Sequence, residues 1–217
     1  MLADIDEQDE NRASTRLLAA ATEEFARRGF AGARIRSIVD AARVNQAAAN
    51  YYFGGKQGLY RATLKHLAAR LEPLEVPVPA SGCPRARLHD CVVALLKRFA
   101  GTEHAAPLAR ILAHEAMSPS GGLDMIFEDA LASEMDLLRT ILRDASPGEI
   151  APENLSAAAH GVLGQCVLYL HARSSIDRNA PAFGIDAEAC EVLASQITRL
   201  AHRALQGSRR TPPGSEK

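Results

Sequence analysis

The stretch that most constrains the fold of this chain is residues 44–56, Val-Asn-Gln-Ala-Ala-Ala-Asn-Tyr-Tyr-Phe-Gly-Gly-Lys. It predicts a short helix over 46–53 that follows the N-cap Asn45 and stops at the Gly-Gly pair. Two helical patterns precede it, at about 15–28 and 34–42, because apolar residues recur there at helical spacing. The sequence therefore predicts three successive helices, with a tight turn at Arg43-Val44 between the second and the third.

The expected third helix has small and amide side chains on its outward face. Gln46, Ala47 and Asn50 share that face, whereas Ala49 and Phe53 share the inward one. Amide side chains can form paired hydrogen bonds with adenine, and alanine is small enough to approach a thymine methyl group. In a helix-turn-helix unit the second helix enters the major groove by its N-terminal residues. We therefore predict base contacts from this face, although a structural three-helix cap with a solvated basic face would show the same spacing.

Positive charge is concentrated in the same part of the chain. Residues 11–71 carry eleven Lys and Arg against three acids, whereas residues 1–10 carry five acids and no base, and the whole chain has a net charge of −1. The side chains placed to reach phosphates or to add positive charge nearby are Tyr52, Lys56, Arg34, Arg36 and Arg43. Phosphate contacts set register and salt dependence, and base contacts set sequence preference. This distribution favours a nucleic-acid partner in spite of the near-neutral total.

Further helical patterns cover most of the remaining chain, at about 58–71, 85–100, 107–117, 123–143, 153–172 and 187–205. No convincing strand pattern of period two occurs, so we predict an all-α fold. The segment 72–84 contains four prolines and cannot be helical. No uncharged apolar run of 18 residues occurs, and the acidic N-terminus is unlike a signal peptide, so we expect a cytoplasmic protein without a spanning helix.

Three runs within about 14–64 place residue types at fixed offsets: Leu17-Leu18-x6-Phe25-x3-Gly29-Phe30, Ile38-Val39-x2-Ala42-x-Val44 and Asn50-Tyr51-Tyr52-Phe53-Gly54-x-Lys56-x2-Leu59. Together they resemble the N-terminal domain of TetR-type transcriptional regulators. The resemblance implies an all-helical homodimer with a DNA-binding domain of three helices and a larger helical domain that binds an effector. The DNA-binding positions that it implies are Arg36, Gln46, Ala47, Asn50, Tyr51, Tyr52 and Lys56.

Two positions depart from the pattern of that family. Thr or Ser usually stands where the second helix begins, and this chain has Arg34 and Ile35; the turn usually has Gly, and this chain has Arg43, which must accept a positive φ. These departures bear on the phosphate contact at the start of the second helix and not on the fold. Further along, residues 108–119, with His114-Glu115 before Met117-Ser118-Pro119, resemble the CecR-like branch of the family.

We expect four segments: an acidic tail (1–13), a helix-turn-helix DNA-binding domain (14–57), an effector-binding and dimerisation domain (58–206) and a disordered tail (207–217). Apolar residues of the larger domain are candidates for an effector pocket, although each would serve equally well in a core: Phe99, Leu112, Met117, Phe127, Leu131 and Tyr169.

The helices expected at 153–172 and 187–205 can form a four-helix bundle with those of a second copy, and a monomeric helical core is the alternative. Gly161 and Gly164 lie inside the first of these helices, where close approach of another helix or a ligand would compensate for their low helix propensity. The expected interface residues are Val162, Cys166, Leu193, Ile197 and Leu200.

Patterns typical of catalysis are missing. His114-Glu115 begins an H-E-x-x-H zinc motif, but Ser118 stands where the second histidine is needed, and Ser120-Gly121-Gly122 lacks the lysine of a phosphate loop. The four cysteines, at 83, 91, 166 and 190, have no C-x-x-C spacing, so buried thiols are expected rather than a metal site or a disulfide. His160 and His171 leave a metal-sensing site open as an alternative to histidines that line a pocket. We expect no catalytic residue, no resident metal and no cofactor.

These features together predict a ligand-responsive transcriptional regulator, acting as a repressor, that binds a palindromic operator as a homodimer. Its expected partners are double-stranded DNA, a small-molecule effector and a second copy of the chain, with no membrane. An activator or a ligand-insensitive regulator of the same fold is one alternative. A helical enzyme or small-molecule-binding module with no role on DNA is a more remote one.

Overall fold

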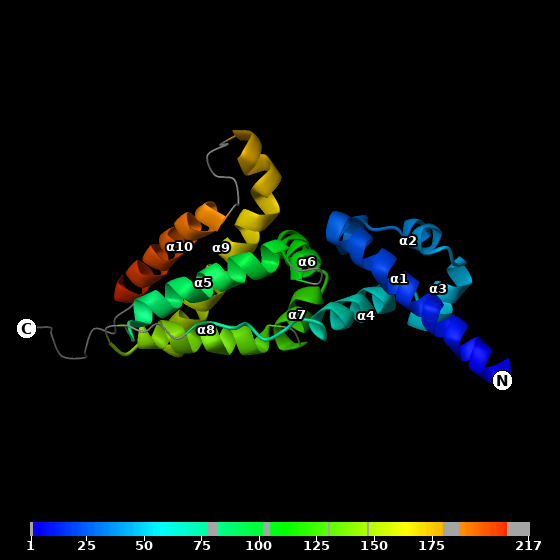
Figure 1. Cartoon of the computed structure of the whole chain (residues 1–217), viewed down its shortest axis with the longest axis horizontal. Coiled ribbons are helices and arrows are strands. Elements are labelled where there is room, and N and C mark those ends of the chain that lie inside the picture. The colour runs from blue at the N-terminus through cyan, green and yellow to red at the C-terminus, as the bar shows by residue number, and fades with distance from the viewer. Residues whose placement is uncertain are drawn as a thin grey trace, which may run out of the picture. The chain divides into compact units, whose positions relative to one another are not determined.

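The computed structural model describes the backbone of residues 2–77, 82–101, 105–129, 131–146, 148–179 and 187–207. Every element in these ranges is an α-helix, and no strand occurs in them (Figure 1). The all-α fold predicted from the sequence is therefore confirmed. The expected disordered tail lies outside the described residues, apart from Gly207.

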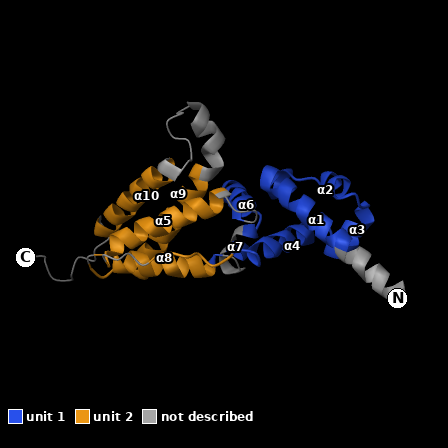
Figure 2. Cartoon of the chain, in the orientation of Figure 1, with its two compact units in different colours: residues 1–71, 102–131 blue, residues 72–101, 132–217 orange. Residues whose placement is uncertain are grey.

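The chain forms two compact units that alternate along the sequence (Figure 2). Unit 1 comprises residues 1–71 and 102–131, and unit 2 comprises residues 72–101 and 132–217. The helices of unit 1 are α1 (Leu2–Gly32), α2 (Ile35–Ala42), α3 (Gln46–Phe53), α4 (Lys56–Ala68), α6 (Ala105–Met117) and α7 (Gly122–Asp129). The helices of unit 2 are α5 (Pro84–Gly101), α8 (Ala132–Asp144), α9 (Pro152–Asn179) and α10 (Ala187–Gly207). This division by contacts differs from the functional boundary expected at residues 57 and 58, which stays a prediction.

Unit 1 is built around α1, which packs against α2, α3, α4 and α6. Phe25 of α1 is fully buried, and its ring meets the edge of the Tyr60 ring of α4 at 4.8 Å between centroids. Phe30 lies 5.0 Å from the same tyrosine ring. This aromatic cluster holds α4 against the C-terminal end of α1, and apolar side chains of α1, α2, α3 and α4 complete the core: Leu17, Ala21, Ile38, Val39, Ala49, Leu59 and Leu64.

The first helix is longer than its periodicity predicted. Its backbone is helical from Leu2, so the segment expected as an acidic tail continues into α1. At Gly29, where the sequence predicted a stop, the backbone leaves the helical region with φ 65° and ψ 177°, and the chain kinks before Gly32. A Cβ atom on Gly29 would come within 3.0 Å of the His114 side chain. Glycine is therefore required here both for the positive φ and for the close approach of α6.

A buried carboxylate joins α4, α6 and α7 inside unit 1. Glu115 of α6 is only 1% exposed, and its Oε1 accepts a hydrogen bond from the Tyr60 hydroxyl at 2.7 Å. Its Oε2 accepts hydrogen bonds from the backbone N–H groups of Ser120 at 2.9 Å and Gly122 at 3.1 Å, and the Ser120 hydroxyl donates to Oε1. Burial alone would raise the pKa of Glu115, but these hydrogen bonds outweigh it and hold the pKa below its ordinary value.

Unit 2 is a bundle in which α5 packs against α8, α9 and α10. Its core contains the apolar faces of all four helices, including Leu95, Leu138, Val162 and Ile197. Arg98 of α5 forms a nearly buried ion pair with Glu134 of α8, at 2.7 Å, and also donates to the carbonyl of Glu72. The bundle is thus closed by apolar packing and by one buried pair of opposite charges.

Most other helices begin and end close to the predicted positions, with two exceptions. α9 continues to Asn179 instead of ending near residue 172. The single helix expected over 123–143 is two helices, α7 and α8, and the backbone N–H of Leu131 donates to Ile126 where the first ends. Apolar residues continue at helical spacing across the break, so periodicity alone could not show it. Only the local change of backbone direction separates these helices, and it assigns them to different units.

Three of the four cysteines, Cys91, Cys166 and Cys190, are buried, and all four are reduced thiols. Burial raises the pKa of the Cys91 and Cys166 thiols to about 12. Both thiols are therefore uncharged and unreactive at neutral pH, as the sequence predicted for Cys166. Within the described part of the chain, no helix has both the length and the apolar character needed to cross a membrane.

Candidate nucleic-acid interface

The start of α2 is fixed by a carboxylate from α1 instead of by its own N-cap side chain. Arg34 stands at the N-cap in an extended conformation and makes no capping bond of its own. Its backbone N–H donates to Oε1 of the buried Glu24 at 3.3 Å, and Glu24 also pairs with Arg27 at 2.5 Å and Arg28 at 3.2 Å. Burial would raise the pKa of Glu24, but its bonds to these arginines lower it below the ordinary value. Glu24 thus anchors the backbone of the N-cap residue, while the first turn of α2 has no side-chain cap.

The turn between α2 and α3 contains no glycine. Arg43 has φ 55° and ψ 48°, in the left-handed region, as the sequence predicted. Its N–H donates to the carbonyl of Asp40 at 3.2 Å, and the N–H of Val44 donates to that of Val39 at 3.1 Å. These two hydrogen bonds close the C-terminal end of α2 and offset the strain of a non-glycine residue in this conformation.

The helix expected over 46–53 is α3, with the predicted bounds. The Asn45 side chain accepts a hydrogen bond from the N–H of Ala48 at 2.7 Å, so Asn45 is the N-cap. Ala49 is fully buried against the neighbouring helices. Gln46, Ala47 and Asn50 are exposed, and we call these three residues the outer face of α3. The cap and the buried alanine together fix the rotation of α3, which turns its amide side chains toward solvent.

The aromatic end of α3 is partly exposed. Tyr51 is 78% exposed, and its ring makes an edge contact with the ring of the half-buried Tyr52. The two ring centroids are 5.2 Å apart. Arg36, on the first turn of α2, is also exposed. Each of these predicted DNA contacts has surface available for a ligand.

Lys56 differs from the others because it is already engaged within unit 1. Its ammonium donates to the carbonyl of Ala31 at 3.4 Å and lies 4.8 Å from the centroid of the Phe30 ring. Lys56 is the first residue of α4, where the helix dipole adds positive potential. The side chain therefore ties α4 to the end of α1 and still presents a half-buried cation at a helix N-terminus.

The turn from α3 to α4 requires its glycines. Gly54 and Gly55 have φ 67° and 96°, so both occupy conformations that side chains disfavour. A Cβ atom on Gly58 would lie 1.7 Å from the carbonyl oxygen of Phe53, which no side chain can tolerate. This close approach sets the position of α4 relative to the end of α3, and the sequence did not reveal it.

The comparison with known families agrees with this geometry. Residues 17–63 match the bacterial regulatory proteins of the tetR family. Residues 84–208, more than half of the chain, match the C-terminal domain of the HTH-type transcriptional dual regulator CecR. The chain belongs to the TetR family of transcriptional regulators. Both resemblances predicted from the sequence, to TetR-type proteins and to their CecR-like branch, are confirmed.

Individual TetR-family proteins show the same relationship. Over 68 residues the chain is 35% identical to the HTH-type transcriptional repressor NicS of Pseudomonas putida, an alignment that spans 31% of this chain and 32% of NicS. The solved structure of HlyIIR, a hemolysin II transcriptional regulator, has a TM-score of 0.59 at 21% identity, over 88% of this chain and 97% of that one. The structure of AibR, solved with isovaleryl coenzyme A and operator DNA, has a TM-score of 0.61 at 20% identity. The match covers 87% of this chain and 97% of the AibR chain. At these identities the solved structures show a shared fold.

The residues expected to line the effector pocket of this TetR-family chain are divided between the two units. Leu112 and Leu131 are buried in unit 1, and Phe99 is buried in unit 2, where Tyr169 is half-buried. Met117 is 81% exposed, at the end of α6. The side chain of Phe127 lies outside the described residues. No described cavity is lined by any of the five others, so this pocket stays a prediction.

The residues expected at the dimer interface of this TetR-family chain are mostly internal. Val162, Cys166, Leu193 and Ile197 are all buried in unit 2, although Val162 also lines a groove between α9 and α10. Leu200 is 54% exposed. The spacing of apolar residues could not separate the face of these helices that packs on α5 from the face that points outward, and the interface itself stays a prediction.

No group of three or more metal-ligating side chains occurs among the described residues. His160 shares a hydrogen bond with the carbonyl of Ser156 at 2.7 Å, and the side chain of His171 lies outside the described part of the chain.

The sequence analysis did not identify two residues that position the helix-turn-helix unit. In the sequence, Glu24 could be recognised only as one half of an ordinary i, i+4 ion pair with Arg28. Gly58 could be recognised only as a residue of low helix propensity within a helix.

Proposed function

We propose that this protein is a ligand-responsive transcriptional repressor that binds a palindromic operator as a homodimer. One observation carries the DNA-binding part of the proposal: a capped, eight-residue α3 that leaves Gln46, Ala47 and Asn50 exposed on one face. Arg36 and Tyr51 are exposed in the same helix-turn-helix unit. This combination of amides for base edges and polar or cationic groups for phosphates is what major-groove recognition requires.

The dimer is supported by an unoccupied apolar groove between α9 and α10. It has a volume of about 470 Å³, and small residues of α9 and the Leu200 side chain of α10 line it. A Cβ atom on Gly161 or Gly164 would meet nothing within 4 Å, and Leu168 is 63% exposed nearby on α9. Glycines with open space above them inside an apolar helix suit the close approach of a helix from a second copy. We therefore propose the outward faces of α9 and α10 as the interface. Val162 and Leu200 of the expected set line this groove, and Cys166, Leu193 and Ile197 do not.

Ligand response is supported by the way in which α4 is attached. Glu115 connects α4 to α6 and to the start of α7, and α4 follows α3 after two glycines. A displacement of α6 or α7 on effector binding would thus be passed to α4 and to the outer face of α3. Operator half-sites are read together only at a fixed spacing, so a small rotation of each α3 lowers specific affinity. The complex of AibR with isovaleryl coenzyme A is a precedent from a protein of the same fold.

Repression is supported by the relationship to NicS, which is described as a repressor. The description of CecR as a dual regulator favours a second candidate, in which the same protein also activates some promoters. Both candidates act on DNA in the cytoplasm. Reporter expression in cells with and without the gene distinguishes them, because loss of a repressor raises expression and loss of an activator lowers it.

The test of the proposal begins with selection of bound sequences from random duplexes by the full-length protein. Fluorescence anisotropy then compares the selected duplex with an unrelated one at about 50 and 200 mM salt. The double substitution Gln46→Ala/Asn50→Ala should weaken binding to the selected duplex at least tenfold and leave the unrelated duplex nearly unchanged. Lys56→Ala should weaken both alike and reduce the salt dependence.

Gln206→Ala is the matched control, because it removes an exposed amide that bonds only to His202 of the same helix. It should bind both duplexes like the wild type. Equal losses from the double substitution and from Lys56→Ala would contradict the proposed division of roles. Failure of the wild-type protein to enrich any sequence would contradict DNA recognition itself.

A further inference from the structure

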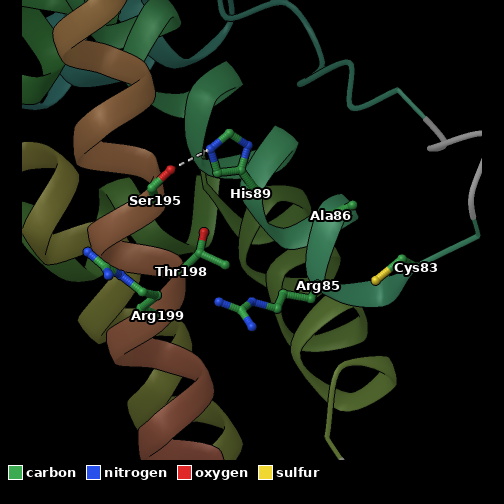
Figure 3. A pocket seen from close by; sticks show the side chains of 7 residues that line it. All are labelled: Cys83, Arg85, Ala86, His89, Ser195, Thr198 and Arg199. Atoms are coloured by element: carbon green, nitrogen blue, oxygen red, sulfur yellow. Dashed lines mark hydrogen bonds between the residues drawn. The ribbon is translucent and has the colours of Figure 1, made fainter.

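A second cavity, of about 590 Å³, lies in unit 2 between the first turns of α5 and the C-terminal half of α10 (Figure 3). Its lining includes two arginines and a histidine and no acidic residue: Arg85 and His89 of α5 and Arg199 of α10. A volume of this size is in the range of pockets that hold small molecules. The function proposed above makes no use of this cavity.

The positive charge of the cavity comes from its two guanidinium groups. Arg85 and Arg199 are exposed and line the cavity, and neither forms an ion pair with any described side chain. Figure 3 shows Arg85 extending from α5 toward α10, whereas the guanidinium of Arg199 lies across α10 and would have to turn to reach the same space. His89 shares a hydrogen bond with the Ser195 hydroxyl at 3.3 Å and has carboxylates of Asp90 and Glu191 at 3.6 Å. These two acids offset a charge on His89, whereas nothing described offsets the arginines.

A buried hydroxyl without a partner lies between the same two helices. Thr198 is 3% exposed, and it is the one buried residue among those that line the cavity. Its Oγ1 has no hydrogen-bond partner in the described structure. Figure 3 shows this hydroxyl on the side of α10 that faces α5, between His89 and Arg85. A buried hydroxyl that bonds to nothing is unfavourable, and a ligand oxygen brought beside it would relieve that cost.

The end of a helix adds to the same potential. α5 is an 18-residue helix that begins at Pro84, and Arg85 and Ala86 of its first turn line the cavity. The first amide groups of a helix have no acceptor within the helix, and that end carries partial positive charge. Two arginines, the first turn of a helix and a residue with an unpartnered hydroxyl therefore line one small-molecule-sized space.

We propose that this cavity binds a small molecule through an oxyanion, a carboxylate or a phosphate group, held by Arg85 and Arg199 with Thr198 donating a hydrogen bond. Guanidinium groups bind both kinds of oxyanion in paired geometry. The bound group would join α5 to α10 and stabilise unit 2. The inference does not rest on DNA binding, because it concerns residues of unit 2 alone.

Calorimetry and thermal unfolding of the full-length protein without DNA test the site, with inorganic phosphate and butyrate as probes and butyramide as the neutral analogue. At about ten times its Kd, a bound probe should raise the Tm by about 3 °C. Arg85→Gln and Arg199→Gln should each weaken binding at least tenfold. Arg203→Gln, one turn further along α10 and outside the cavity, is the matched control and should bind like the wild type.

Thr198 supplies a separate measure that does not depend on charge. Thr198→Val removes the unpartnered hydroxyl at nearly constant volume, so it should raise the Tm of the free protein by about 2 °C and weaken probe binding about tenfold. Thr198→Ser should keep the binding. Binding of only one probe supports the site and identifies its oxyanion. No binding of either probe, equal binding of butyramide and butyrate, or binding that survives both arginine substitutions overturns the proposal.

Discussion

At the scale of single residues, α2 and α3 are held in place by a few hydrogen bonds between backbone groups and side chains, and by the conformation of the turn between them. Asn45 caps α3, Glu24 receives the first N–H of the α2 region, and Arg43 turns the chain in a left-handed conformation. A helix of two turns is marginal without such anchors, since isolated short helices do not persist in water. Each anchor therefore contributes to the presentation of the outer face of α3.

Asn45→Ala should lower the free energy of unfolding by about 1 kcal/mol, because the N–H of Ala48 loses its acceptor. It should also weaken DNA binding, since the first turn of α3 carries the outer face. Chemical denaturation and anisotropy on the selected duplex measure the two effects. Asn45→Ser keeps a capping oxygen and should retain most of the stability; an equal loss in both variants would show that the cap is not the cause.

The sequence was sufficient for the residues that act locally. Asn45 precedes the helix that it caps, and Arg43 occupies the turn itself, so both were predictable from neighbours in the chain. Glu24 acts on Arg34, ten residues away, and Gly58 is required by the carbonyl of Phe53. Such contacts depend on how helices cross, and a single sequence carries no local signal for them.

At the scale of elements, the attachment of α4 decides how the rest of unit 1 can influence α3. The link is chemical and specific: one carboxylate on α6 accepts hydrogen bonds from α4, from the loop after α6 and from the first residue of α7. A Cβ atom on Gly122 would lie 2.8 Å from the Tyr60 hydroxyl, so the start of α7 is packed tightly against this link.

Glu115→Gln should destabilise the protein by about 2 kcal/mol at neutral pH, because its NH2 group would face backbone donors that now lack an acceptor. The pKa of Glu115 is lower in the folded than in the unfolded protein, so its contribution is present above the unfolded value, near 4.5, and is lost as the pH falls through the folded value. Denaturation from pH 7 to 3 should therefore show a smaller acid-induced loss in the variant.

Tyr60→Phe is the control for this prediction. It removes one donor and leaves the backbone bonds to Glu115 intact, so it should cost less stability than Glu115→Gln and keep more of the pH dependence. An identical pH dependence in wild type and Glu115→Gln would contradict the assigned role of this carboxylate.

The order of helices along the chain did not show which of them pack together. Periodicity predicted most helices, because each has an apolar face, but the break between α7 and α8 interrupts no pattern. Consequently the expected pocket residues on α6, such as Leu112, lie in a different unit from Phe99 of α5. Apolar spacing identifies the residues that will be buried, but only the fold shows which helix each of them packs against.

At the scale of the whole molecule, the proposed function requires two copies, and the outward faces of α9 and α10 are the surface that we propose for their contact. Leu200→Glu should convert a dimer to a monomer in sedimentation equilibrium, because it places a charge in the apolar groove. Affinity for the palindromic duplex should fall, while each subunit keeps its helical content by circular dichroism.

Ala132→Glu introduces the same charge at an exposed position in the first turn of α8 and should leave the dimer intact. A dimeric Leu200→Glu variant would place the interface elsewhere. The choice of these two helices stays a prediction. The sequence analysis named mainly residues that are buried in one protomer, because burial within one protomer and burial between protomers give the same apolar pattern.

The exposure of Gln46, Ala47 and Asn50 has a consequence for how this protein can change over time. All three side chains are exposed, and none takes part in a hydrogen bond recorded among the described residues, so we expect their replacement to leave the scaffold intact. Substitutions can therefore change which promoter sequence the protein prefers without destabilising its fold. Duplicated copies of such a gene are free to acquire new targets while Asn45, Ala49 and the glycines after α3 stay unchanged.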